Sequence, residues 1–261
     1  MHSEHAARKL FPAGLHQPAG SFRFSVDALL LAAFAAEAIQ DESAAIPALD
    51  LGCGCGVVGL GLLLLNGNCR VLGVDIHAPL VQAACDNARY LGLAERFEAA
   101  TVDFANKNSV KKLPCGIFAL AAANPPFREV GAGRLPPSDS RRLALFSTPQ
   151  TLPAFLDAAR RALAPQGVLA LIYPAEKREA LWEALAATGF APSRVLPVRS
   201  RHNNTPIRLL VLARREPLCS GSLSPDEEPL TLFRDESQTY STEAVRFCPF
   251  LRQKAPQPAA T

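Results

Sequence analysis

The chain has 261 residues, 49% of them hydrophobic and 20% charged, a balance that is typical of a globular protein with ample material for a core. The longest apolar runs, around Leu29–Ala36 and Val57–Leu65, are too short for a membrane-spanning helix, which needs about 20 residues, so we expect a soluble protein. The formal net charge of +3 is unevenly distributed. Residues 1–127 hold 9 Lys/Arg and 11 Asp/Glu, whereas residues 128–261 hold 18 Lys/Arg and 13 Asp/Glu, so the positive charge lies in the second half.

Predicted strands and helices alternate along most of the chain. Residues 1–20 show little periodicity and are expected to be a flexible arm. An apolar helix is expected to begin from Ser25, which can cap it, with Ala28–Ile39 as its body. The predicted strands are Ile46–Leu51, Arg70–Asp75, Phe97–Val102, Phe118–Ala123, Gly167–Tyr173, Val195–Val198 and Arg208–Ala213. The predicted helices between them are Val57–Leu65, Pro79–Leu91, Pro149–Leu163 and Ala175–Thr188.

This alternation predicts an α/β fold, with a mostly parallel sheet that has helices on both faces. The last two strands are separated only by the polar loop Ser200–Pro206, so we expect them to form an antiparallel hairpin. We expect a single domain over residues 21–252 and a frayed tail over residues 253–261.

A glycine-rich loop, Asp50–Gly56, follows the first strand and opens a helix. Glycines let the backbone approach a ligand closely, and the helix N-terminus offers free N–H groups to a carboxylate or phosphate. Gly54–Gly59 also matches the dinucleotide pattern G-x-G-x-x-G, with Asp75 about twenty residues further on. Both NAD and S-adenosylmethionine have a ribose diol that a strand-end carboxylate can bind, so the loop alone fits either cofactor.

Two other aspartates lie near this loop in the predicted topology. Asp103 ends the third strand, where its carboxylate can accept a hydrogen bond from the exocyclic amine of a cofactor adenine. Asp50 precedes the glycines, and either a structural role or a cofactor contact fits its position.

The segment Asn124–Phe127, Asn-Pro-Pro-Phe, follows the fourth strand directly. Its two prolines stiffen the backbone and leave carbonyls that can only accept hydrogen bonds. The side-chain oxygen of Asn124 and the carbonyl of Pro125 can each accept one hydrogen of an amino group, so that the nitrogen lone pair is free to attack the methyl group of a sulfonium. Phe127 offers a flat face on which a planar base can stack. The segment therefore favours S-adenosylmethionine over NAD.

Three stretches resemble the bacterial tRNA (adenine-N(6))-methyltransferase family that acts on valine tRNA, within the class I amino-methyltransferases. They are Phe22–Leu31, the glycine loop together with Asn124–Phe127, and Asp235 with Tyr240–Glu243. The resemblance implies a seven-stranded sheet, cofactor contacts at Gly52, Gly54, Gly56, Asp75 and Asp103, and target-amine contacts at Asn124, Pro125 and Phe127. One departure is that Ser140–Phe146 follows the basic pattern of the family only loosely.

Arginines gather in two places that suit an RNA partner. Arg128, Arg134, Arg141 and Arg142 follow the Asn-Pro-Pro-Phe segment, and Arg128, Arg141 and Arg142 are the candidates for RNA contact. Six more lie on the predicted hairpin, where they can follow phosphates or serve as solvated surface residues: Arg194, Arg199, Arg201, Arg208, Arg214 and Arg215.

Several functions share these features. The leading hypothesis is an RNA adenine methyltransferase; glutamine N(5) methylation of a protein, guanine N(2) methylation of ribosomal RNA and an NAD-dependent oxidoreductase are the others. The seven cysteines include no Cys-x-x-Cys pair, so a zinc site and a disulfide framework both lack support. The first 30 residues show no secretory signal, and we expect a cytoplasmic enzyme without a metal.

Overall fold

A computed structural model describes residues 4–21, 23–39, 45–129, 146–215, 227–234 and 238–252. Its main sheet has the strand order β10-β8-β9-β7-β4-β1-β2-β3. These strands are β1 (Ile46–Leu51), β2 (Cys69–Asp75), β3 (Phe97–Thr101), β4 (Phe118–Ala123), β7 (Leu163–Pro174), β8 (Phe190–Arg199), β9 (Arg208–Arg215) and β10 (Leu230–Thr231). A separate pair of two-residue strands consists of β5 (Arg128–Glu129) and β6 (Phe146–Ser147).

The sheet is parallel except around β9, which pairs antiparallel with both β7 and β8. The predicted C-terminal hairpin is therefore confirmed. The seven expected strands are all present, and the short β10 adds an eighth next to β8. In parallel sheets of this kind, ligands bind beyond the carboxyl ends of the strands.

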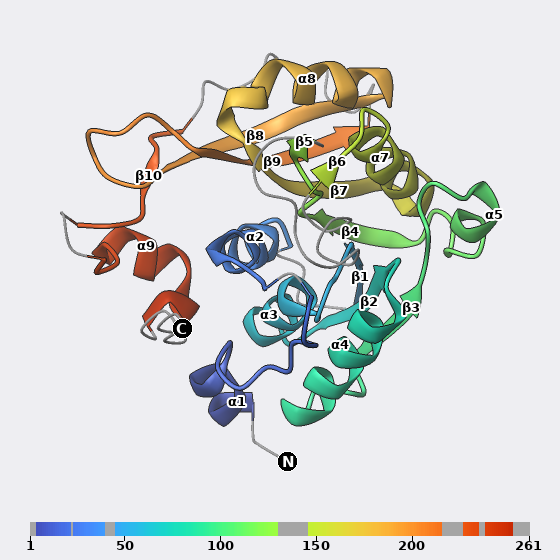
Figure 1. Cartoon of the computed structure of the whole chain (residues 1–261), viewed down its shortest axis with the longest axis horizontal. Coiled ribbons are helices and arrows are strands. Elements are labelled where there is room, and N and C mark those ends of the chain that lie inside the picture. Colours follow the sequence, from blue (N-terminus) through green and yellow to red (C-terminus); the bar gives the residue numbers. More distant parts are fainter. Residues whose placement is uncertain are drawn as a thin grey trace.

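Helices cover both faces of the sheet (Figure 1). One face carries α2 (Val26–Glu37), α3 (Val57–Leu65) and α4 (Ala78–Tyr90), with α1 (Glu4–Leu10), α9 (Thr242–Phe247) and η2 (Pro249–Arg252) packed outside them. The other face carries α7 (Thr151–Ala162) and α8 (Arg178–Ala187), which η1 (Ala175–Lys177) precedes, and α5 (Lys107–Val110) lies beside them. Both faces of the central strands are therefore buried, as their continuous apolar sequences predict.

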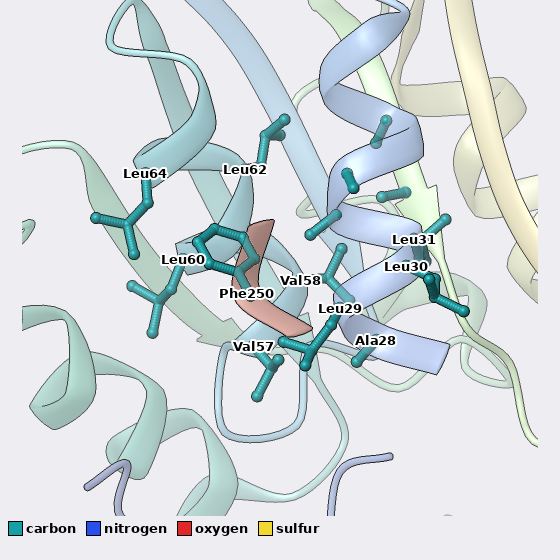
Figure 2. Close-up of a cluster of buried hydrophobic side chains, with 14 of the residues drawn as sticks. Ala28, Leu29, Leu30, Leu31, Val57, Val58, Leu60, Leu62, Leu64 and Phe250 are labelled. Atoms are coloured by element: carbon teal, nitrogen blue, oxygen red, sulfur yellow. The ribbon is translucent and has the colours of Figure 1, made fainter. Parts of the chain in front are cut away.

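The larger core lies between α2, α3 and the C-terminal segment (Figure 2). Leu30, Leu31 and Leu60 are completely buried there. A Cβ atom at Gly61 would lie 2.9 Å from the Cβ of Ala32, so α2 and α3 approach too closely for a larger residue. Burial of each leucine contributes about 1.5–3 kcal/mol, so this helix pair fixes the start of α2 firmly against the sheet.

Residues 4–20 differ from the flexible arm that the sequence predicted. Residues Glu4–Leu10 form α1, and Ala7 and Phe11 are completely buried. The Phe11 ring packs edge-on against Phe250, with 4.7 Å between the ring centroids. The arm is ordered by apolar contacts with the C-terminal segment, which no local periodicity could reveal. The expected frayed tail lies outside the described residues.

The predicted cap of the second helix is confirmed, because the Ser25 hydroxyl accepts a hydrogen bond from the N–H of Asp27. Near the end of the chain, the ring of Tyr240 stacks on Phe233 and the Ser241 hydroxyl caps α9. Tyr240 and Ser241, which belong to one of the stretches that resemble the family, therefore stabilise the C-terminal segment. None of the helices in the described ranges is long and apolar enough to span a membrane.

Candidate active site

The glycine loop joins β1 to α3 at the carboxyl edge of the sheet. Gly52 has a φ of +72°, and a Cβ atom there would lie 3.0 Å from the ring of Phe155. Gly56 has a φ of +89° and is the N-cap of α3. Both positions lie in the left-handed region, which glycine adopts without steric cost. The tight turn from strand to helix therefore depends on these two glycines.

Asp75, the last residue of β2, holds this loop in place. One of its carboxylate oxygens accepts a hydrogen bond from the N–H of Gly54 and the other from the N–H of His77, each at 2.9 Å. The side chain is buried, and this burial raises its pKa despite backbone hydrogen bonds from His77, Gly54 and Ile76. An ionised carboxylate has about four acceptor positions, so these contacts leave acceptor capacity for a diol.

Asp50 lies behind the loop. Its carboxylate accepts a hydrogen bond of 2.8 Å from the N–H of Gly59 in the first turn of α3. Burial, reinforced by the nearby charge of Asp75, raises the pKa of Asp50 to about 7. The sequence left the role of Asp50 open; in the structure it joins the end of β1 to α3, and it does not line the cavity.

Asp103 follows β3, the edge strand next to β2. Its carboxylate accepts a hydrogen bond from the N–H of Ala105, and its own N–H donates to the hydroxyl of Ser109. The next residue, Phe104, packs edge-on against Phe155, with ring centroids 4.6 Å apart. Ile76 is 43% exposed although it is a large hydrophobic residue, and it lines the same cavity. These groups suit a planar aromatic ligand with one polar edge.

The Asn-Pro-Pro-Phe segment follows β4, the strand next to β1. Pro125 is buried, whereas Asn124, Pro126 and Phe127 are half-buried. The carbonyl of Phe127 accepts a hydrogen bond of 3.0 Å from the Nζ of Lys177. The guanidinium carbon of Arg208 lies 4.8 Å from the centroid of the Phe127 ring. The segment is therefore fixed both by its prolines and by two cationic side chains.

A single cavity of about 1060 Å³ joins these parts. Most of the predicted site residues line it: Gly52, Gly54, Asp75, Asp103, Asn124, Pro125 and Phe127. Gly56 does not, and its position at the N-cap of α3 gives it a conformational role. Pockets for single small molecules usually enclose about 300–1,000 Å³, so this one has room for a large cofactor and for part of a second ligand.

Sequence reasoning missed a part of the cavity wall. Phe24, Ser25 and Asp27, at the start of α2, also line the cavity. Asp27 is buried, and its carboxylate accepts a hydrogen bond of 3.0 Å from the Nε of Arg208. The sequence signal for this part of the wall is the resemblance of Phe22–Leu31 to the methyltransferase family.

The arginines of the C-terminal hairpin are largely occupied by contacts within the protein. Arg194 forms ion pairs with Glu37 and Glu227. Arg199 donates to Thr231, Arg214 to the carbonyl of Gln166, and Arg215 to the carbonyl of Leu163. These contacts join the hairpin to its neighbours; the sequence left open whether the arginines contact phosphates or belong to the protein's own surface, and phosphate contact stays a prediction. Arg141, Arg142 and the side chain of Arg128 lie outside the described part of the structure.

Within the described ranges, no cluster of three or more His, Cys, Asp or Glu residues could hold a metal ion. The cysteines that the structure describes are free thiols, and burial raises the pKa of Cys55 to about 12, so this thiol beside the cavity is protonated at neutral pH.

Comparison with known proteins identifies the family. The model of the methyltransferase small domain matches residues 27–186, which include α2, the glycine loop, Asp75 and Asn124–Phe127. The chain belongs to this family. It is an S-adenosylmethionine-dependent methyltransferase, and the NAD-dependent oxidoreductase that the glycine pattern left open is excluded.

Relatives within the methyltransferases include enzymes with two kinds of substrate. The chain is 29% identical over 237 residues to a tRNA1(Val) (adenine(37)-N6)-methyltransferase of Porphyromonas gingivalis, with 89% of each chain covered. It is 27% identical to the enzyme of the same name from Tolumonas auensis, with 76% of this chain and 78% of the relative covered. It is also 34% identical to a release factor glutamine methyltransferase of Moorella thermoacetica, over 57% of this chain and 53% of the relative.

Among solved structures, the fold is similar to that of a predicted O-methyltransferase from Agrobacterium tumefaciens. The TM-score is 0.66 at 18% identity, and the match covers 86% of this chain and 96% of the other. The class I methyltransferase fold that the sequence predicted is thereby confirmed.

Proposed function

We propose that this methyltransferase transfers a methyl group to the exocyclic N(6) of an adenine in a tRNA. The observation that carries the proposal is that Asn124, Pro125 and Phe127 line the same cavity as the glycine loop and Asp75. The relatives that match over most of their length are named as methyltransferases of adenine in tRNA1(Val).

The cofactor half of the cavity fits S-adenosylmethionine. The glycine loop, whose glycines have positive φ, lets the protein backbone approach the ligand closely. Asp75 retains acceptor capacity for the ribose hydroxyls. Asp103 would accept a hydrogen bond from the adenine amine, beside Phe104 and Ile76. Gly52 and Gly54 line the loop side of this half, and Gly56 sets the direction of α3. When bound, the cofactor supplies a methyl group carried by a sulfonium.

The other half of the cavity fits a planar group with an amine at its edge. The side-chain oxygen of Asn124 and the carbonyl of Pro125 each accept one amine hydrogen, and the base stacks on Phe127. With both hydrogens held, the nitrogen lone pair points away from the ring toward the methyl carbon. The bound cofactor would supply the methyl carbon and keep the electron pair of the carbon–sulfur bond, while the methylated nitrogen would lose its proton to solvent. The chemistry is mainly positioning, so no strong base is needed.

A second substrate is favoured by one specific observation. The chain is 34% identical over 155 residues to a release factor glutamine methyltransferase. A glutamine side chain presents the same amino group to Asn124 and Pro125, but it has no ring that could stack on Phe127.

The two proposals are separated by labelling. The protein is incubated with tritiated S-adenosylmethionine and, separately, with unmodified tRNA, ribosomal RNA and a release factor. We expect label in tRNA, released as N(6)-methyladenosine after digestion to nucleosides. Label confined to the release factor would contradict the adenine proposal, and label in ribosomal RNA as a methylated guanosine would replace it with guanine N(2) methylation.

A further inference from the structure

Arg208 connects two walls of the cavity that are far apart in the sequence. Its Nε donates to the carboxylate of Asp27 at 3.0 Å, across 181 residues of chain. Its guanidinium carbon lies 4.8 Å from the centroid of the Phe127 ring, within the roughly 6 Å of a cation–π contact. Both members of the ion pair are shielded from water, with side-chain exposures of 23% for Arg208 and 12% for Asp27.

The topology explains how the three residues meet. Arg208 is the first residue of β9 and is paired with Pro174, the last residue of β7. Because β9 runs antiparallel to β7, its first residue lies at the carboxyl edge of the sheet, beside the segment that follows β4. Asp27 lies in the first turn of α2 and lines the same cavity. The contact therefore forms only in the folded sheet.

Phe127 is held from two directions. Lys177 donates to its backbone carbonyl, and Arg208 covers one side of its ring. The guanidinium covers one side of the ring, and Phe127 also packs in part against the apolar cluster on the α7 and α8 side of the sheet. The residue is nevertheless only half-buried. Phe127 is one of the residues that line the cavity, so the part of it left uncovered is where a second planar group would lie.

We propose that Arg208 is a positioning residue: anchored by Asp27, it fixes the ring of Phe127 so that the uncovered part receives the target base. This inference rests on the proposed function, in which Phe127 stacks on the group to be methylated. An arginine suits the task because its planar guanidinium can lie over a ring while its Nε donates to a carboxylate. A lysine ammonium keeps the charge, but it lacks the flat guanidinium group and its fixed set of N–H donors.

A double-mutant cycle tests whether Arg208 acts through Phe127. With tRNA as substrate, Arg208→Ala should lower kcat/KM by about 5- to 30-fold, the size expected of a cation–π contact that is partly shielded from water. In a Phe127→Ala background the same substitution should change it by less than about twofold, because the ring to be positioned is absent. Arg208→Lys should recover only part of the loss. Equal losses in both backgrounds would overturn the proposal, since they would show that Arg208 acts independently, for example on a phosphate.

The matched control lies on the same strand. Arg214 donates to the carbonyl of Gln166 and does not line the cavity. Arg214→Ala should therefore leave kcat/KM unchanged. Calorimetry of the Arg208→Ala protein should give S-adenosylmethionine affinity within about threefold of wild type; a general loss of structure would weaken it further.

A measurement without substrate separates this inference from the proposed function. In a Trp182→Phe background, Phe127→Trp places a single indole at position 127, whose acrylamide quenching reports its mobility and exposure. Arg208→Ala should raise the quenching constant about twofold because a ring contact is lost, and Arg214→Ala should not. If no RNA or protein accepts label, the proposed function fails, whereas the quenching result still tests whether Arg208 fixes the side chain at position 127; unchanged quenching overturns the inference.

Discussion

The carboxylate of Asp75 accepts a hydrogen bond of 2.9 Å from the backbone N–H of Gly54. The side chain that ends β2 therefore fixes the loop that follows β1. This contact explains why a carboxylate at the end of the second strand matters before any ligand is bound: it orders the glycine loop and also lines the cofactor cavity.

Replacing Asp75 should therefore weaken cofactor binding. Asp75→Ala removes the acceptors for Gly54 and His77 and the proposed ribose contact. Hydrogen bonds to charged groups contribute about 1.5–3 kcal/mol, so we expect the Kd for S-adenosylmethionine to rise about 10- to 100-fold in calorimetry. Asp86→Ala, at an exposed position on α4, is the control and should bind normally. An unchanged Kd in Asp75→Ala would contradict the assignment of the cavity.

Asp50 should make the stability of the protein depend on pH. Its pKa is raised from 3.8 to about 7 in the folded protein, mainly by burial. Below about pH 4 the carboxyl group is protonated in both folded and unfolded states. Between about pH 4 and pH 7 the unfolded chain has lost this proton and the folded chain retains it, so the free energy of unfolding falls by up to about 1.4 kcal/mol per pH unit.

The Asp50→Asn variant lacks this titration. Urea denaturation of both proteins at several pH values should show the variant gaining stability relative to wild type from about pH 4 to about pH 7, with no further change above. The difference between the two curves is compared, because groups that do not interact with Asp50 titrate equally in both proteins. A flat difference across this window would contradict the raised pKa.

Gly52 should tolerate no side chain. Its φ is +72°, and an added Cβ atom would lie 3.0 Å from the Phe155 ring. Gly52→Ala should lower the free energy of unfolding by about 1–2 kcal/mol, because alanine is strained in the left-handed region. Gly67→Ala is the control, since a Cβ atom at Gly67 has no neighbour within 4 Å. Equal melting temperatures for Gly52→Ala and wild type would contradict the steric argument.

Phe127 should contribute to substrate affinity through its ring. Stacking of a base on an aromatic side chain contributes about 1–3 kcal/mol, so Phe127→Ala should lower kcat/KM for tRNA by about 5- to 150-fold. Phe127→Tyr keeps the ring and should retain most of the activity. If the tyrosine variant loses as much activity as the alanine variant, the ring face is not what binds the substrate.

Most of the sheet could be predicted because its central strands are continuous apolar runs that end at polar residues such as Asp75 and Asn124. The start of β8 was missed, since Pro192–Arg194 interrupts the apolar pattern and the strand pairing shifts register there. Helix α1 was missed because Phe11 is buried against Phe250, far away in the sequence. Local patterns cannot show contacts of that kind.

The parts of the site that could be predicted are those in which several functional residues lie next to one another in the sequence. The glycine loop and Asn124–Phe127 are contiguous, and the parallel topology brings the strand ends to one edge. The pairing of Asp27 with Arg208 was not predictable, because it depends on side-chain geometry between α2 and β9. The arginines of the hairpin were read as a charged surface, and their partners became visible only in the structure.

The central claim is that Asn124 binds the amine that accepts the methyl group. The most direct test is single-turnover methyl transfer from S-adenosylmethionine to tRNA by the Asn124→Ala variant, with cofactor affinity measured on the same preparation. We predict that transfer falls at least about 100-fold, in keeping with the loss of precise positioning, while the Kd for the cofactor stays within about threefold. Transfer at the wild-type rate by a variant that binds the cofactor normally would contradict the account.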